Sequence, residues 1–314
     1  MFSSARCAVL GLAVLLTAAC GPNLARQNFP RSTVSATAAP AADAAVVSVA
    51  NLRTVDPCAL LDAASRGSLG TIDADSVDGY SLDECGMDVT DAVGKKMNLQ
   101  LKLSDFIVGA TTTGTIGGLP ISVDNQNGSC NVDAVTSTSD GLAISMRASY
   151  PGGDPCGAAQ TALQNALRKL GADPPRLAQP AGSLVAVDFC TMVDDATITG
   201  ALGRGSTSSA FGLHGCSWSG GIATGELQLD AGSRPTADDG DLVDLGGGVT
   251  GYQKLETSNG KRCAIKWLHR PDDGRTGEVV TFDYDNYHGD AGNDDACGKA
   301  QTVVKAALAK LPRA

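Results

Sequence analysis

The chain contains ten cysteines, the residues most open to a chemical role. Cys7 and Cys20 lie in or just after an apolar N-terminal stretch, and the other eight are Cys58, Cys85, Cys130, Cys156, Cys190, Cys216, Cys263 and Cys297. Such residues could bind zinc, act as a redox pair or form structural disulfides. No Cys-x-x-Cys pair is present, although zinc sites and thiol oxidoreductases commonly use one, so structural disulfides are favoured.

The spacing of these eight cysteines is repeated. The first four are separated by 27, 45 and 26 residues, and the second four by 26, 47 and 34. If each group of four bonds internally, three pairings per group are open. The pairing with the shortest loops is favoured, and each such loop should stabilise the fold by about 3 kcal/mol on the chain-entropy model. The bonds predicted are Cys58–Cys85, Cys130–Cys156, Cys190–Cys216 and Cys263–Cys297.

The residues around the cysteines are repeated as well. "VDPCALLDAASRGSLG" from Val55 corresponds to "VDFCTMVDDATITGALG" from Val187. "DPCGAAQTALQNALRKLG" from Asp154 corresponds to "DACGKAQTVVKAALAKLP" from Asp295. We therefore predict two divergent copies of one domain, over residues 54–171 and 184–314, joined by a Pro-rich linker at 172–183.

The acidic segment "DYDNYHGDAGNDD" from Asp283 matches a calcium-binding loop at its first and third positions. Tyr287 is not a ligand of the right type, His288 stands where glycine is required, and Asp294 stands where a bidentate glutamate should be. A solvated loop leading to a helix cap at Asp295 is favoured. We predict no metal site and no cofactor.

"GCSWSGG" from Gly215 approaches the Gly-x-Ser-x-Gly motif of serine hydrolases, but Ser219 stands at the last glycine. The three histidines, His214, His269 and His288, are expected at the surface rather than in a zinc site or a catalytic triad. We predict no catalytic residue and no enzymatic activity. An envelope hydrolase with an unrecognised site in the second copy is the alternative.

Aromatic residues are concentrated in the second copy, which has eight, whereas the first copy has three. Aromatic side chains contribute strongly to binding sites. The candidate ligand surface consists of Trp218, Tyr252, Trp267 and Tyr287. A role in the second core is the competing and favoured interpretation, and for Trp267 it is supported by its position along a predicted strand.

The elements that position these residues are predicted to be helices at both ends of each copy and strands between them. In the Asp-x-Cys motifs, aspartate is a good N-cap, proline suits the first helical position where present, and cysteine falls in the first turn. The predicted caps are Asp56, Asp154, Asp188 and Asp295. Each C-terminal helix is amphipathic, with apolar faces at Ala159, Leu163, Ala166, Leu167 and Leu170 and at Val304, Ala307, Leu308 and Leu311.

Alternating apolar residues between the helices indicate strands, as in "MNLQLKLS", "LAISMRA" and "EVVTFDYD". Cys85 has the parity of Met87 and Val89, and Cys263 that of Ile265 and Trp267. The fold class predicted for each copy is α+β: about five mostly antiparallel strands, with helices pinned to one face by two disulfides.

The N-terminus has the features of an export signal. Arg6 precedes the apolar run Cys7–Leu16, and "LTAAC" then ends at Cys20. This segment resembles the lipobox of bacterial lipoproteins, which implies a signal peptide at 1–19 and lipidation of Cys20. Residues 20–53, rich in Ala, Ser, Thr and Pro, are predicted to be a tether. The expected location is the cell membrane, lipid-anchored on the extracytoplasmic face. The net charge of −10 argues against nucleic acid as a partner.

An export signal with a lipobox, "DPCALLDAA" near the start, a later "CSW" at Cys216 and a closing Cys-led helix together resemble actinobacterial lipoproteins of the domain-of-unknown-function family 3558. The resemblance implies a disulfide-bonded domain of the cell envelope in a high-GC Gram-positive bacterium. It implies no catalytic residues. We therefore expect a binding or sensor-like interaction module, which contacts the membrane through its anchor and binds an envelope protein, glycan or lipid.

Overall fold

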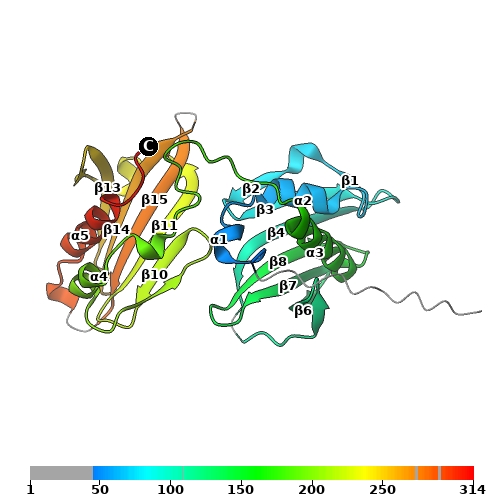
Figure 1. Cartoon of the computed structure of the whole chain (residues 1–314), viewed down its shortest axis with the longest axis horizontal. Helices are drawn as coiled ribbons and strands as arrows, with labels where there is room; N and C mark the ends of the chain where they lie inside the picture. Colours follow the sequence, from blue (N-terminus) through cyan, green and yellow to red (C-terminus); the bar gives the residue numbers. More distant parts are fainter. Residues whose placement is uncertain (1–44, 108, 273–274, 289–290) are drawn as a thin grey trace, which may run out of the picture. The chain divides into compact units, whose positions relative to one another are not determined.

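The structure of the chain, a computed structural model, describes residues 45–314 except 108, 273–274 and 289–290 (Figure 1). The predicted signal peptide, the predicted lipidation site Cys20 and most of the predicted tether lie outside the described residues. None of the helices in the described part is long and apolar enough to cross a membrane.

Two antiparallel sheets, each with helices on one face, form the described part of the chain (Figure 1). The strands of the first sheet are β1 (Thr71–Ile72), β2 (Asp78–Ser81), β3 (Glu84–Thr90), β4 (Lys96–Phe106), β5 (Gly114–Ile116), β6 (Leu119–Gln126), β7 (Ser129–Ser137) and β8 (Leu142–Ser149). Those of the second are β9 (Thr207–Ala210), β10 (Gly215–Ser219), β11 (Thr224–Ser233), β12 (Asp241–Gly246), β13 (Val249–Glu256), β14 (Lys261–Pro271) and β15 (Thr276–Asn286). The predicted α+β class is confirmed.

The two sheets have the same strand order. The first runs β1-β3-β4-β8-β7-β6-β5, with β2 also paired to β3, and the second runs β9-β10-β11-β15-β14-β13-β12. The last strand of each sheet in sequence therefore lies in its middle. β8 lies between β4 and β7, which carries Cys130, and β15 lies between β11 and β14, which carries Cys263. The strand number is higher than expected because short edge strands extend both sheets.

Helices cover one face of each sheet. The α-helices are α1 (Val49–Leu52), α2 (Pro57–Ser65), α3 (Pro155–Ala172), α4 (Asp195–Leu202) and α5 (Ala296–Leu308). The 3₁₀ turns are η2 (Ala74–Ser76), η3 (Phe189–Thr191), η4 (Ala237–Asp239) and η5 (Ala291–Asn293). The predicted caps form: the carboxylate of Asp56 accepts from the backbone N–H of Cys58 and Ala59, and Asp154 and Asp295 each accept from the N–H three residues on.

The segment that precedes the second sheet differs from the one that precedes the first at its initial helix. Asp188 caps only the 3₁₀ turn η3, and the α-helix α4 begins later, with Asp194 as its N-cap. The prediction of a helix starting at Asp188 was therefore wrong in length. Pro57 occupies the first helical position after the cap Asp56, whereas the residue after the cap Asp188 is Phe189. The second segment therefore lacks the proline that favours the start of a helix.

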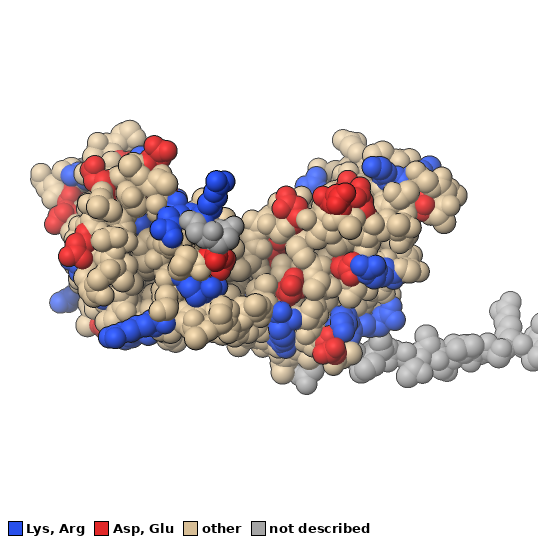
Figure 2. Space-filling model, turned by 90° about the horizontal axis from the view of Figure 1, so that it is seen from above, with Lys and Arg blue, Asp and Glu red and all other residues tan. Residues whose placement is uncertain are grey.

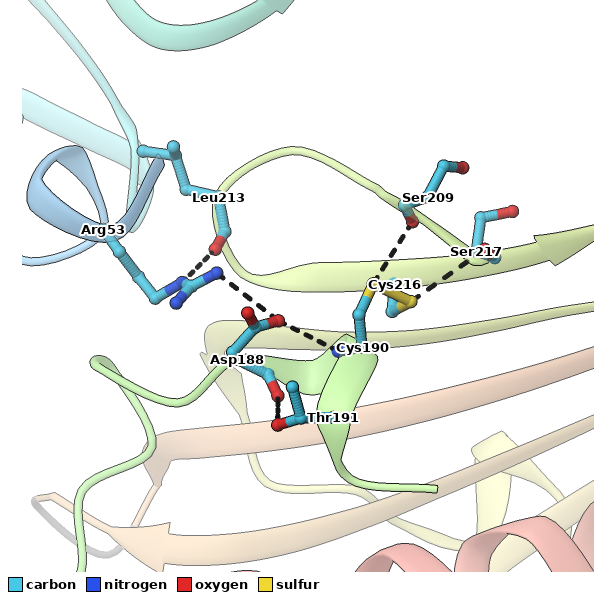
Figure 3. Close-up of a disulfide and its surroundings, with 8 residues drawn as sticks. All are labelled: Arg53, Asp188, Cys190, Thr191, Ser209, Leu213, Cys216 and Ser217. Carbon is cyan, nitrogen blue, oxygen red and sulfur yellow. Dashed lines mark hydrogen bonds and ion pairs between the residues drawn. A yellow bond between two sulfur atoms is a disulfide. The ribbon is translucent and has the colours of Figure 1, made fainter. Parts of the chain in front are cut away.

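All four predicted disulfides are confirmed. The bonds are Cys58–Cys85, Cys130–Cys156, Cys190–Cys216 and Cys263–Cys297, with Cα–Cα distances of 5.0 to 5.2 Å. Each joins the first turn of a helix, or of η3, to a strand (Figure 3). Figure 3 shows the Cys190–Cys216 disulfide. The backbone N–H of Cys190 donates to Asp188 Oδ1 at 3.1 Å, so the helix cap and the disulfide both hold the same turn.

Strand alternation builds both cores. Met97, Leu99, Leu101 and Leu103 on β4 are all buried, and so are Cys263, Ile265 and Trp267 on β14. These side chains belong to the two clusters that also contain the apolar faces of α3 and α5. Burial of apolar area, at about 25 cal/mol per Å², holds the helices on the sheets.

Ordered structure extends beyond the predicted limits of the first copy. Val47 and Leu52, in the segment predicted to be tether, are buried in the first core. In the predicted linker, Arg176 bonds to Asn51 and Thr54 through its guanidinium group, and the backbone of Leu177 donates to Thr54 O. Both segments thus pack on the first copy instead of hanging free of it.

Candidate functional site

The four residues predicted as a ligand surface do not form one surface. Trp218 on β10 is 3 % exposed and lies in the second core, so it offers no ligand surface and has the core role that the sequence favoured; its strand parity with Cys216 points it at the helices. Tyr252 is half-buried on β13, opposite Lys266. Tyr287, 61 % exposed, follows Asn286, which pairs with Lys261. Five residues of β14 therefore separate the two tyrosines, roughly 17 Å.

Trp267 is also fully buried and belongs to the second core, so it presents no open surface. It nevertheless forms part of the wall of a cavity of about 610 Å³ within the second copy. This cavity, the C-terminal cavity hereafter, lies between the end of α5 and the strands β12 to β14. Its lining comprises Leu245, Gly246, Gly247, Val249, Trp267, Leu268, His269, Lys305, Leu308, Ala309, Leu311, Pro312, Arg313 and Ala314.

Two irregularities in the sheet shape one wall. The register between β14 and β15 shifts between Leu268 and Arg270, which is a β-bulge at His269. A bulge re-aims side chains locally, and consecutive residues of β14 therefore contribute to the same cavity. The turn from β12 to β13 contains Gly246, Gly247 and Gly248, all at positive φ (86°, 63° and 84°), a conformation that side-chain-bearing residues rarely adopt.

The opposite wall is the end of α5 and the residues that follow it. The last turn is closed by bonds from the N–H groups of Lys310 and Leu311 to Ala307 O. Leu311 is buried under this turn, whereas Leu308 is half-buried at the cavity. Lys305 lies in the last turn of α5, where its charge complements the negative end of the helix dipole.

A hydrogen bond fixes the orientation of His269. Its Nε2 lies 2.9 Å from the carbonyl oxygen of Gly182. A carbonyl oxygen only accepts, so Nε2 carries the hydrogen and, in the neutral ring, Nδ1 is the acceptor. Gly182 has φ +79°, and a Cβ at this position would lie 2.4 Å from Arg313 O. The linker therefore passes this close to the cavity wall only because residue 182 has no side chain.

The charged side chains that line the cavity are both cationic, Lys305 and Arg313. Both are exposed, and within the described part of the chain neither forms an ion pair. The chain as a whole has a net charge of −10, and acidic and basic side chains are intermixed on the face shown in Figure 2. The two charged side chains of the C-terminal cavity are thus cationic, although the chain as a whole is acidic.

The indole nitrogen of Trp267 is buried and, among the described residues, has no hydrogen-bond partner. A buried N–H without an acceptor costs about 1–3 kcal/mol relative to a satisfied one. Such groups are rare in folded proteins and ask for an explanation. This donor was not predictable from the sequence, because strand parity indicates only that Trp267 points inward.

A second concave region, on the polar face of the second sheet, has a volume of about 590 Å³. Two of the three cations in its lining are paired: Lys266 Nζ lies 2.7 Å from Asp239 Oδ1, and Arg262 Nη2 lies 2.8 Å from Asp283 Oδ1. The lining also contains three carboxylates, those of Asp230, Asp239 and Asp283, so positive and negative side chains balance in this region. We therefore regard the C-terminal cavity as the better candidate site.

The three histidines lie in different environments. His288 is exposed and His269 half-buried, but His214 is only 6 % exposed, so the prediction of a surface position was wrong for His214. Burial lowers the pKa of its imidazole to about 4. In the described part of the chain, no three His, Cys, Asp or Glu side chains form a group that could hold a metal ion.

The other two motifs have structural roles. "GCSWS" forms the strand β10 (Gly215–Ser219), not the sharp strand-to-helix turn that exposes a nucleophilic serine. In the acidic segment, Asp294 forms an ion pair with Lys299, and Asp295 caps α5 as predicted. Asp290 lies outside the described residues.

Comparisons with known proteins bear on the family. The family model "Protein of unknown function (DUF3558)" matches residues 15–169, a range that includes the first sheet. This match supports the family expected from the sequence motifs. A search of curated proteins found no match.

Two solved structures have low similarity to the chain. One is described as the crystal structure of MucB in complex with MucA(peri), with 14% identity, coverage of 79% of this chain and 95% of that chain, and a TM-score of 0.15. The other is the di-domain ARO/CYC BexL from the BE-7585A biosynthetic pathway, with 12% identity, coverage of 86% and 90%, and a TM-score of 0.15. At this TM-score neither similarity carries an argument about fold or function.

Proposed function

We propose that the protein is a lipid-anchored binding module of the cell envelope, built from two tandem copies of one domain, and that a small ligand occupies the C-terminal cavity. The observation that carries the binding role is the cavity itself. It has a volume of about 610 Å³, and the charged side chains of its lining, Lys305 and Arg313, are cationic. Cavities of this volume are typical of small-molecule sites.

The duplication is supported by three correspondences. The strand order is the same in both sheets, each copy has two disulfides between corresponding elements, and the Asp-x-Cys motifs recur at the same places. The family match covers the first copy. We extend the family to the second copy on the strength of these correspondences.

Export and anchoring are supported by the N-terminal motif and the disulfides. "LTAAC" ending at Cys20 has the pattern of a lipidation site. Four disulfides are typical of proteins that fold in oxidising surroundings, outside the cytosol. We place the protein on the extracytoplasmic face of the cell membrane of an actinobacterium, the source that the family resemblance implies.

Binding is a better proposal than hydrolysis for this cavity. His269 is the one candidate base among the described residues of its lining, and no serine, cysteine, aspartate or glutamate side chain lines it. Nucleophilic catalysis requires a nucleophile within hydrogen-bond reach of its base. The arrangement supplies walls, charge and hydrogen-bond donors, which suit recognition.

The test is capture of a small molecule by the whole chain carrying Cys20→Ser, which can be handled without detergent. The protein is incubated with an extract of envelope small molecules, separated from unbound material and analysed by native mass spectrometry. Ala309→Trp, on an exposed residue of the lining, should fill the cavity and abolish the added mass. Thr302→Trp, on an exposed residue of the same helix away from the cavity, should keep it.

Thermal unfolding of each variant checks that the fold is intact. Recovery of no ligand by the parent chain, or of the same ligand by Ala309→Trp, would count against the proposed function.

A further inference from the structure

We propose that the contact between the two sheet-bearing halves of the chain is sensitive to acid, and that protonation of His214 opens it while both halves stay folded. The first half is built on β1 to β8 with α1 to α3, and the second on β9 to β15 with α4 and α5. This inference concerns the contact between the halves and is independent of the proposed ligand.

Each half buries side chains of the other. Leu213, which precedes β10, is 2 % exposed and belongs to the hydrophobic core of the first half. Leu82, between β2 and β3, packs against the core of the second half. Ser104 on β4 is also 2 % exposed, and a Cβ on Gly212 would lie 3.3 Å from its Oγ. Separation of the halves would return these groups to water, so their burial favours the closed contact.

The segment that carries Leu213 and His214 is fixed through its backbone. The buried guanidinium of Arg53, in the first half, donates from Nε to the carbonyl oxygen of Leu213 at 2.7 Å (Figure 3). Its Nη2 lies 3.7 Å from Asp188 Oδ1. The carbonyl oxygen of His214 accepts from the N–H of Leu229 at 2.9 Å. Both bonds hold the imidazole of His214 at the contact.

His214 is an unexpected residue for such a place. It is 6 % exposed, and among the described residues neither ring nitrogen has a hydrogen-bond partner. In the neutral ring one nitrogen is a donor and the other an acceptor, so the closed contact leaves both unsatisfied. An apolar side chain of similar size would avoid this cost, but it would not titrate near neutral pH. The residue type therefore indicates a role in the response to pH.

The charged groups around His214 come from both halves. Those that line the same cavity are Asp83, Glu84, Lys102 and Asp230. Burial lowers the pKa of His214 to about 4, the nearby Arg53 acts in the same direction, and Asp83 and Glu278 act against it. The carboxylate of Asp83 already accepts hydrogen bonds from Ser81 and Ser104. Removal of the ring from water thus outweighs the attraction of the carboxylates.

Opening of the contact returns His214 to water, where its pKa is about 6.5. The open state binds the proton more tightly than the closed state, so a falling pH shifts the equilibrium towards it. These two pKa values make the opening constant about 20-fold larger at pH 5 than at pH 7, and about 100-fold larger at pH 4. Each half should stay folded, because each has its own core and two disulfides.

The experiment measures how often Leu213 leaves the first core, in the whole Cys20→Ser chain carrying Leu213→Cys. The new thiol is labelled with a dipyridyl disulfide at several pH values. Each rate is divided by that of the peptide 209–215 with the same change, which cancels the titration of the thiol itself. The ratio should rise about 20-fold between pH 7 and pH 5. With His214→Leu added, the rise should be less than about twofold.

Control variants separate opening from unfolding. His288→Leu removes an exposed histidine of the second half and should leave the rise unchanged. Ala166→Cys in the first core and Val303→Cys in the second are fully buried, and both thiols should stay unreactive at pH 5. Because Leu213→Cys itself weakens the contact, Ser104→Cys provides a second reporter with nearly the native shape, and it should show the same rise.

A ratio that does not rise in acid at either reporter would overturn the inference, and so would an equal rise in the His214→Leu chain. An equal rise at the two core thiols would show that acid unfolds the halves instead of parting them, which also contradicts it. A rise at Leu213→Cys and Ser104→Cys alone, abolished by His214→Leu, supports it.

Discussion

Lys299 Nζ lies 2.7 Å from Asp294 Oδ1, and Asp294 Oδ2 accepts hydrogen bonds from Tyr284 Oη at 2.6 Å and Asn286 Nδ2 at 2.9 Å. The Asp294 side chain is 8 % exposed. The Lys299 ammonium also lies 5.6 Å from the centre of the Tyr284 ring. The carboxylate that stands at the last position of the calcium-like segment thus joins the end of β15 to the first turn of α5.

Asp294→Asn should lower the free energy of unfolding by about 2 kcal/mol at neutral pH, because the partly buried Lys299 loses its ion-pair partner and two donors lose a charged acceptor. Urea unfolding measures this loss. Glu256→Gln, which breaks the exposed pair of Lys254 and Glu256, is the matched control and should have no measurable effect. Equal effects of the two substitutions would contradict the role of burial.

The stability loss caused by Asp294→Asn should also depend on pH. Burial alone raises the pKa of Asp294, but the hydrogen bonds from Lys299, Tyr284 and Asn286 outweigh it and leave the pKa below its usual value. A carboxyl whose folded pKa is lowered stabilises the fold above its unfolded pKa of about 3.9 and loses that contribution as the pH falls through the folded value. The difference between Asp294→Asn and the parent should therefore shrink below about pH 4.

His214 should make the fold sensitive to mild acid. Burial holds its pKa at about 4 in the folded chain, below the value of about 6.5 expected when unfolded. The unfolded state therefore binds the proton first, and stability falls as the pH drops from about 6.5 to about 4, by about 3 kcal/mol in total.

His214→Leu removes this titration. Because both ring nitrogens of His214 are buried without a partner among the described residues, an apolar side chain of similar size should cost little at pH 7. Urea unfolding at several pH values between 7 and 4 should then give a flatter curve for the variant. If the stability of the parent and of His214→Leu changed equally with pH, a group other than His214 would be responsible for the acid sensitivity.

Loss of the Cys130–Cys156 disulfide and loss of the Cys263–Cys297 disulfide should lower the free energy of unfolding by similar amounts. Replacing Cys130 and Cys156 together by serine opens a loop of 26 residues, and replacing Cys263 and Cys297 opens one of 34. Loop entropy depends only weakly on length, so each pair should cost about 3 kcal/mol, with a difference of a few tenths. Urea unfolding under non-reducing conditions measures both.

Cys20→Ser should release the protein from the membrane fraction, because an unmodified chain would lack the proposed lipid. Fractionation of cells with an antibody against the described domains measures this. A conservative Cys7→Ser variant, within the predicted signal peptide, is the control and should remain membrane-bound. Retention of Cys20→Ser in the membrane would rule out anchoring through this residue.

Local sequence patterns were enough to predict several elements of this fold. An aspartate two residues before a cysteine indicates a helix cap, because the carboxylate satisfies N–H groups that no residue of the helix can reach. Alternation from Met97 to Leu103 identifies the inward face of β4, because successive side chains of a strand point to opposite sides. The repeated cysteine spacing, with the pairing that closes the shortest loops, also predicted the four disulfides.

The positions of the 3₁₀ turn, the buried His214 and the C-terminal cavity depend on long-range packing. Asp188 has the sequence of a cap, but it begins a 3₁₀ turn and α4 starts at Asp195. His214 is buried, although it was expected at the surface, and Trp218, one of the candidates for a ligand surface, lies in the core. The C-terminal cavity depends on a bulge at His269, the glycine turn before β13 and the end of α5, which are distant in sequence. Their meeting results from long-range packing, on which no local pattern reports.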